Sequence, residues 1–245
     1  MDSLRKKLQQ ELLRQPDIQI QQSDSWGLPV VLITIPYTTI KRTTMDILMK
    51  MILLTVQKLD VTESKKIADF LAVEPLFIEN LFNKMESAQM IELRKDRFQL
   101  TSVGVSQLQS GIYEHPPEKA EKTFYYSPCH DSILCEQPEK VFTAKVKEFR
   151  LAKKFTRSPQ RLDDEQLRAT LIATGAEAAE GPLQKIVDKI EIPQSLANQF
   201  IPCVEFSLYN RTENSYFTRV WNTLTEEWDE RLEKLIDEQA PLRKK

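Results

Sequence analysis

The chain has 245 residues, of which 41% are hydrophobic and 29% charged, and its formal net charge is −2. This composition is typical of a folded chain with room for two domains, and it argues against extensive disorder. Five glycines against 13 prolines leave no Gly-rich phosphate loop, which excludes the nucleotide-binding classes that depend on one.

The first 40 residues predict a helix followed by a strand. Residues 1–15 carry leucines at helical spacing and end before Pro16, and the β-branched run Leu28–Ile35 is typical of a buried strand. The N-terminus lacks the apolar core of a secretory signal, and no apolar stretch approaches the roughly 20 residues of a membrane span. We therefore expect a cytoplasmic protein without a membrane partner.

Between Thr44 and Gly111 the pattern predicts three helices, a hairpin and a fourth helix. Apolar residues recur at steps of three and four after the candidate caps Thr44 and Thr62 and after Pro75. The predicted inward faces contain Met45, Leu48, Met49, Ile52, Leu53, Val56 and Leu59, then Ile67, Phe70 and Leu71, then Phe77, Ile78, Leu81, Phe82 and Met85. From Ile91 to Leu100 the period changes to two around Lys95-Asp96, which predicts a short hairpin.

This order of elements, together with the run Leu100-Thr101-Ser102-Val103-Gly104, resembles the winged helix domains of bacterial transcriptional regulators. The resemblance covers about residues 44–111, with the hairpin as the wing and the third helix as the DNA-reading helix. We expect Thr101 to cap the outgoing helix and Gly104 to leave room for close packing against the wing strand. Winged helices also serve as protein-docking modules, so the resemblance leaves both functions open.

The remaining sequence predicts a linker and a second domain. Residues 112–122 contain Pro116-Pro117 and mixed charges, as linkers do. We therefore predict an α+β fold with a winged helix domain and a C-terminal mixed α/β domain, divided into residues 1–40, 41–111, 112–122 and 123–245. Within the last part we expect short strands at Thr123–Tyr126 and Ile133–Cys135, helices from Asp163 and Pro182, strands at Phe200–Tyr209 and Phe217–Trp221, and a helix from Thr225.

Two groups of residues are candidates for nucleic-acid binding. Amides on the third helix can pair with adenine edges, and cations on that helix and the wing can hold phosphate. The second group is the segment Lys140–Arg161, which has eight basic residues against the single acid Glu148. The predicted binding residues are Asn80, Asn83, Lys84, Arg94, Lys95, Arg97, Lys153, Lys154 and Arg157.

Each group has a second interpretation. The basic segment could be a solvated face whose charges pair with the acidic C-terminal region. The third helix carries Glu74, Glu79 and Glu86 against the single base Lys84, a charge balance that opposes approach to phosphates. Double-stranded DNA and a protein partner therefore both remain candidate ligands.

No catalytic, cofactor or metal site is predicted. Cys129, His130, Cys135 and Cys203 lack a paired Cys-x-x-Cys, and we interpret the three cysteines as ordinary thiols, with metal ligation left open. We predict a non-enzymatic DNA-binding or regulatory protein, or alternatively a docking subunit of a larger complex. An enzyme whose site residues are dispersed along the chain is the third alternative.

Self-association is also predicted. The segments Leu4–Leu13 and Trp228–Ile236 each present an apolar stripe at one end of the chain, where no further element is available to cover it. Such stripes commonly pair with a second copy of the same chain. We therefore expect a homodimer through the terminal helices.

Overall fold

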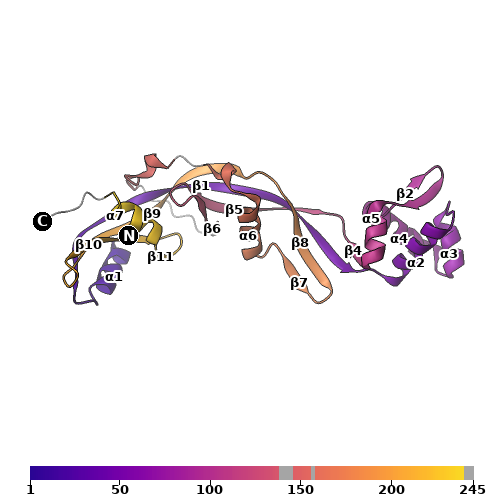
Figure 1. Cartoon of the computed structure of the whole chain (residues 1–245), viewed down its shortest axis with the longest axis horizontal. Helices are drawn as coiled ribbons and strands as arrows, with labels where there is room; N and C mark the ends of the chain where they lie inside the picture. The colour runs from indigo at the N-terminus through magenta and orange to yellow at the C-terminus, as the bar shows by residue number, and fades with distance from the viewer. Residues whose placement is uncertain (138–145, 156–157, 240–245) are drawn as a thin grey trace. The chain divides into compact units, whose positions relative to one another are not determined.

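The computed structural model describes residues 1–137, 146–155 and 158–239, which form two compact units (Figure 1). Unit 1 consists of Met1–Pro36, Glu121–Gln166 and Glu191–Lys245. Unit 2 consists of Tyr37–Ala120 and Leu167–Ile190. Both units are therefore built from segments that are far apart in the sequence.

An antiparallel sheet, nine-stranded within the described residues, is organised around the 27-residue strand β1 (Ile18–Thr44). In unit 1, β1 pairs with β9 (Gln194–Asn210), which runs beside it in Figure 1. Beyond β9, the sheet continues with β10 (Ser215–Asn222) and then β11 (Glu227–Trp228). On the other side of β1 lie β5 (Glu118–Ser127) and then β6 (Ser132–Glu136).

The core of unit 1 lies on this sheet. Leu28 and Val30 alternate along β1 and are buried with Tyr125, Phe149 and Ile201. The short helix α7 (Glu230–Asp237) adds Leu232, Leu235 and Ile236 to the same cluster. Two 3₁₀ turns, Ala152–Lys154 and Pro159–Arg161, lie in the segment that leads to unit 2.

A second cluster in unit 1 covers the N-terminal helix. Leu8 of α1 (Asp2–Leu12) is buried with Val204, Phe206 and Leu208 of β9. Leu8 of α1 and the apolar residues Leu232, Leu235 and Ile236 of α7 are thus covered within one chain, whereas Leu13 at the end of the predicted N-terminal stripe is 55% exposed. The apolar area that the terminal helices offer to a second copy is therefore smaller than expected.

Unit 2 contains the helices and the hairpin expected for residues 44–111, in the predicted order. They are α2 (Ile47–Lys58), α3 (Ser64–Leu71), α4 (Pro75–Ser87), β2 (Ile91–Arg94), β3 (Arg97–Leu100) and α5 (Ser102–Ser110). The hairpin pairs Arg94 with Arg97, so Lys95 and Asp96 form its two-residue turn, both with positive φ. The unit also holds β4 (Ile112–Glu114), most of α6 (Asp164–Ala173), β7 (Ala178–Glu180) and β8 (Leu183–Ile190).

Local capping explains where several of these helices begin. Asp46, and not the predicted Thr44, caps α2 by accepting a hydrogen bond from the Leu48 amide at 2.7 Å. Thr101 caps α5 as expected, with its hydroxyl accepting from the Gly104 amide at 3.1 Å. A Cβ at Gly104 would lie 2.0 Å from the Met90 carbonyl oxygen, so α5 packs directly on the residue that precedes β2.

The predicted fold class is wrong. The chain is not a small winged helix domain followed by a separate mixed α/β domain, because the strands of the C-terminal half complete a sheet that begins at residue 18. The β-branched run between Gly27 and Pro36 predicts a strand at Leu28–Ile35 only, whereas β1 also includes the polar Gln-rich stretch before it. That stretch is held by backbone pairing with β9 from Ile18↔Asn210 onward.

Two further segments also differ from expectation. Residues 112–122 contribute β4 and the start of β5 in place of a linker, because β4 pairs with the end of β1. The helix expected after Pro182 is the strand β8. Its apolar residues fit helical spacing, but Lys185 to Ile190 pair with Tyr37 to Lys41 of β1 and give the segment a sheet partner.

The buried helical core of unit 2 provides a stability test. Leu53 is 0% and Phe82 3% exposed, and each contacts the same cluster. Truncating either to Ala should lower the free energy of unfolding by about 2–5 kcal/mol, because it leaves a cavity. Urea unfolding checks this, with the exposed Phe70→Ala as a control that should cost little. Wild-type stability of Leu53→Ala or Phe82→Ala would contradict the packing described above.

Gly104 provides a second test. We expect Gly104→Ala to destabilise the protein by about 1–3 kcal/mol, because the added methyl group has no room beside the Met90 carbonyl. Ser106→Ala, at an exposed position of the same helix, is the matched control and should change stability by less than about 0.5 kcal/mol. Equal melting temperatures of the two variants would argue against the close contact.

Candidate functional site

A groove of about 880 Å³ runs beside α4 in unit 2. Asn80, Asn83 and Lys84, three of the predicted DNA-contacting residues, line it from this helix, and all three are exposed. The other lining residues are a mixture of apolar, aromatic and small polar side chains: Thr43, Thr44, Asp46, Met49, Phe77, Leu81, Ser87, Tyr113, His115 and Pro116. The structure therefore brings the three residues together in a groove and not on a basic surface.

The groove carries little net charge. Burial, and next the positive charge of Lys41, lower the pKa of His115, so its ring is neutral at pH 7. The ring lies 4.6 Å from that of Tyr113 between centroids, and its Nε2 is 3.3 Å from the Thr43 hydroxyl. Among the lining residues Lys84 and Asp46 remain as one cation and one anion. This balance gives the groove no strong preference for a polyanion.

Several apolar side chains that we predicted to face inward are exposed. Phe70 is 69% and Phe77 48% exposed, and Leu76 beside Phe77 is 62% exposed. The buried stripe of α4 consists of Ile78, Leu81, Phe82 and Met85, at the spacing of one helical face. Phe77 precedes this stripe by one residue and is therefore rotated by about 100° from it. Leu59, placed in the stripe of α2, lies just after that helix and is likewise exposed.

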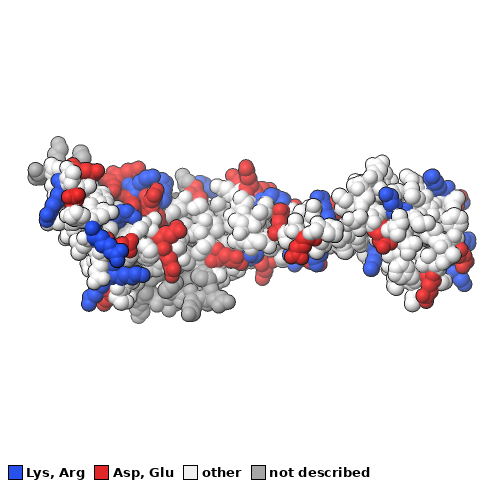
Figure 2. Space-filling model, turned by 90° about the horizontal axis from the view of Figure 1, so that it is seen from below, with Lys and Arg blue, Asp and Glu red and all other residues white. Residues whose placement is uncertain are grey.

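These side chains belong to a wider feature of unit 2. Figure 2 shows the helical part of the chain at the right, where the visible face is mainly uncharged with a few separate Lys, Arg, Asp and Glu residues. Exposed large apolar side chains in residues 47–112 are Ile47, Met51, Leu54, Leu59, Phe70, Leu76, Phe77, Leu93, Val103 and Ile112. Exposed apolar side chains mark interaction surfaces where they lie next to one another.

The wing cations are partly neutralised. Arg94 pairs with Glu92 at 2.8 Å, and Arg97 pairs with Asp60 at 2.6 Å. Lys95 occupies the hairpin turn and is exposed. Exposed ion pairs of this kind are weak, but they reduce the positive charge that the wing offers to phosphate.

The basic segment lies in unit 1, and Lys153 and Lys154 form part of its 3₁₀ turn. Arg150 donates two hydrogen bonds to Glu205, at 2.6 and 3.0 Å, and Lys154 donates to Gln239. Arg157 lies outside the described residues. Phe149 is buried and stacks on Trp26 at 4.1 Å, which removes it from any base-stacking role. Burial and pairing thus weaken both features that suggested nucleic-acid binding here.

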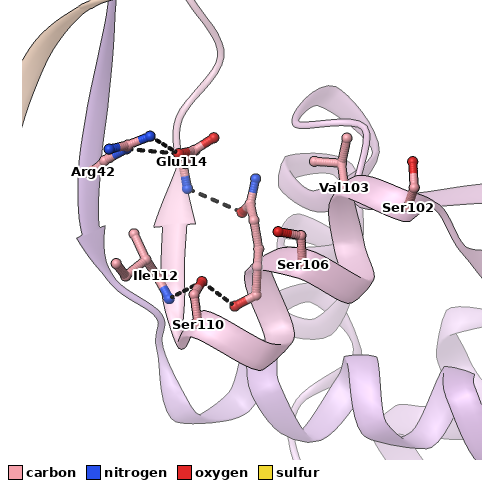
Figure 3. Close-up of a pocket in the computed structure, with 8 residues that line it drawn as sticks. Arg42, Ser102, Val103, Ser106, Ser110, Ile112 and Glu114 are labelled. Atoms are coloured by element: carbon pink, nitrogen blue, oxygen red, sulfur yellow. Dashed lines mark hydrogen bonds and ion pairs between the residues drawn. The ribbon is translucent and has the colours of Figure 1, made fainter.

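A second pocket, of about 490 Å³, lies between α5, β1 and β4 (Figure 3). Arg42 forms an ion pair with Glu114 at 2.7 Å, and the Glu114 amide donates to the side chain of Gln107 at 3.1 Å. The Ser110 hydroxyl donates to the Gln107 carbonyl and accepts from the Ile112 amide. These hydrogen bonds join α5 to the strands, and Ser102 and Ser106 line the same pocket beside them.

A buried hydrogen-bonded chain in unit 1 was not anticipated from the sequence. His130 Nδ1 lies 2.7 Å from the Ser127 hydroxyl, and His130 Nε2 lies 3.0 Å from both carboxylate oxygens of Asp229. The three residue types are those of the Ser-His-Asp arrangement of hydrolases, but the two ring nitrogens are exchanged, because there Nε2 faces the serine and Nδ1 the aspartate. Ser127 is completely buried, however, and cannot reach a substrate. Because 99 residues separate His130 from Asp229, no local motif could have revealed the pair.

These hydrogen bonds instead connect the β5–β6 turn to the start of α7. Asp229 accepts from the Leu232 amide as the N-cap of α7 and from the Asn222 side chain. Burial raises the pKa of Asp229, but the hydrogen bond and charge of His130, with the bonds from Asn222 and Leu232, outweigh it and lower the pKa overall. Asp229 is therefore ionised and structurally engaged at neutral pH.

The cysteines remain thiols. Burial raises the pKa of Cys129 to about 12, with the negative charge of Asp229 as a second cause, and burial also raises the pKa of Cys135 and Cys203. Metal ions bind the thiolate form, so these shifts disfavour ligation. Within the described ranges, no group of three or more His, Cys, Asp or Glu side chains is arranged to hold a metal ion.

Comparison of the chain with known protein families, curated proteins and solved structures finds no match. No helix among the described residues is long and apolar enough to cross a membrane.

Asp229 generates a prediction about pH. Its lowered pKa stabilises the fold at pH values above the unfolded-state pKa of about 4, and this contribution is lost as the pH falls through the lower folded-state value. We expect Asp229→Asn to cost about 1–3 kcal/mol at pH 7, with the difference from wild type shrinking in acid. Urea unfolding across this range measures it. A difference that is independent of pH, or equal to that of the exposed control Asp24→Asn, would contradict the role of the charge.

Proposed function

We propose that the helical part of unit 2 is a protein-docking domain. Its docking surface consists of Phe70, Leu76 and Phe77, at the end of α3 and the start of α4, which we call the α3–α4 surface. The observation that carries the proposal is the exposure of all three side chains, from 48% to 69%. Burying such side chains against a partner yields about 1.5–3 kcal/mol each, and aromatic residues are enriched at binding hot spots.

The charges around this surface favour a polypeptide over DNA. From Glu63 to Glu86 there are five acids, Glu63, Asp69, Glu74, Glu79 and Glu86, against the three bases Lys65, Lys66 and Lys84, a local net charge of −2. DNA phosphates would be repelled by this excess, whereas Lys or Arg residues of a polypeptide would be attracted. The partner proposed here is thus an apolar segment of another protein flanked by basic residues.

Duplex DNA is the second candidate ligand, supported by the exposed amides of Asn80 and Asn83 and by Lys84 on α4. These groups could contact base edges or phosphates. They also suit a polypeptide, because amide side chains both donate and accept hydrogen bonds. The two ligands differ in their response to salt and to substitution of the α3–α4 surface.

Fluorescence anisotropy with three labelled probes separates the candidates. The probes are an amphipathic peptide of Leu and Lys of about 18 residues, the same peptide with Glu in place of Lys, and duplex DNA of about 30 base pairs. We expect the full chain to bind the Leu/Lys peptide and to bind the other two much more weakly. The double variant Leu76→Ser/Phe77→Ser should weaken peptide binding about tenfold or more.

Leu93→Ser, at an exposed wing position outside the α3–α4 surface, is the matched control and should bind the peptide like wild type. Unchanged peptide affinity of the double variant would overturn the docking surface. Tighter binding of DNA than of peptide, with affinity falling steeply as salt is added, would favour the DNA-binding candidate in its place.

A further inference from the structure

The first half of β9 has an open backbone edge in unit 1. On one side β1 pairs with β9 from Gln194 to Asn210. On the other side β10 pairs only with the part from Cys203 to Asn210. No strand of the described residues pairs with the outer edge of Gln194–Pro202, so alternate N–H and C=O groups of this segment face outward without a strand partner.

This edge lacks the charged side chains that usually protect a strand edge against pairing. Proteins commonly block an exposed edge with charged side chains, especially Lys, but no charged residue occurs between Glu191 and Glu205. Instead, Leu196 is 57% and Phe200 42% exposed, and Gln194 to Asn198 are all exposed. The pairing of this segment with β1 has one irregularity, a register shift between Ala197, opposite Leu32, and Ser195, opposite Ile33, which leaves Leu196 as the extra residue of β9. The edge is therefore uncharged and accessible, and it carries two exposed apolar side chains.

We infer that this edge pairs with the same edge of a second copy of the chain. In an antiparallel pair related by a two-fold axis at Asn198, Asn198 lies opposite its own equivalent. Leu196 then lies opposite Phe200 of the second copy, and Phe200 opposite Leu196. Both exposed apolar side chains of each copy gain a partner in this single register.

The sequence around the axis is compatible with self-pairing. Like charges directly opposite one another destabilise a strand pair, and the segment contains none. Proline cannot donate a backbone hydrogen bond, and Pro193 and Pro202 bracket the segment, which limits the new ladder to the residues between them. A homodimer was expected from the terminal helices, whose apolar faces are largely covered within the chain, and the β9 edge provides a separate surface for it.

Sedimentation equilibrium of the full chain at tens of micromolar tests the inference first, and a dimer is expected. Leu196→Lys should weaken the dimer about tenfold or more, since it removes two apolar contacts and places two cations near the axis. Ala179→Lys, on the exposed edge strand β7 of unit 2, is the matched control and should sediment like wild type. A monomeric wild-type chain would overturn the proposal, and a strand of another protein would then be the candidate partner of this edge.

A cross-link tests the register. Directly opposite residues of an antiparallel pair have Cα atoms about 4.5–5.5 Å apart, within the range that a disulfide spans. Asn198→Cys should therefore give a covalent dimer under mild oxidation, seen on a non-reducing gel, whereas wild type and Ala179→Cys should not. A dimer of wild type that Leu196→Lys leaves intact, or one that Asn198→Cys fails to cross-link, would place the interface elsewhere and contradict the proposal.

Discussion

The backbone pairing of β1 is the constraint on which the rest of the structure depends. This one strand pairs with β9, β8, β4 and β5 along its 27 residues, and it contributes to both units. Its middle supplies Leu28 and Val30 to the core of unit 1, and its end leads directly into α2. Segments distant in the sequence are therefore joined by a ladder of hydrogen bonds and not by a single local core.

Local signals in the sequence located the helices well and the sheet poorly. Apolar spacing, Pro75 and the Thr101 cap depend on residues within one or two turns, so the helices of residues 44–111 were predicted in order. Strand pairing depends on residues far away in the chain. The helix predicted after Pro182 shows the difference, because its apolar residues suit either structure and only the pairing of β8 with β1 decides between them.

The candidate surfaces, too, depend on contacts between residues that are far apart in the sequence. Asn80, Asn83 and Lys84 were predicted as binding residues from chemical type alone, and they do line a groove. The exposure of Phe70 and Phe77 was missed, since periodicity gives the direction of a side chain but not what lies beyond it. The acidic partners of individual cations could not be identified for a related reason: Arg97 is paired by Asp60 and Arg150 by Glu205, partners that linear spacing does not reveal.

The distribution of polar and apolar groups among the described residues is the reason that we propose an interaction role. The most enzyme-like constellation, Ser127–His130–Asp229, is buried and engaged in holding a turn to α7. The accessible features are the α3–α4 surface and the uncharged edge of β9, both of which leave apolar side chains in water. A folded chain that exposes aromatic residues at one surface and an uncharged strand edge at another increases its risk of aggregation. The two proposed partners would cover these surfaces, and they differ because the α3–α4 surface lies in a segment with an excess of acids whereas the β9 edge carries no charge.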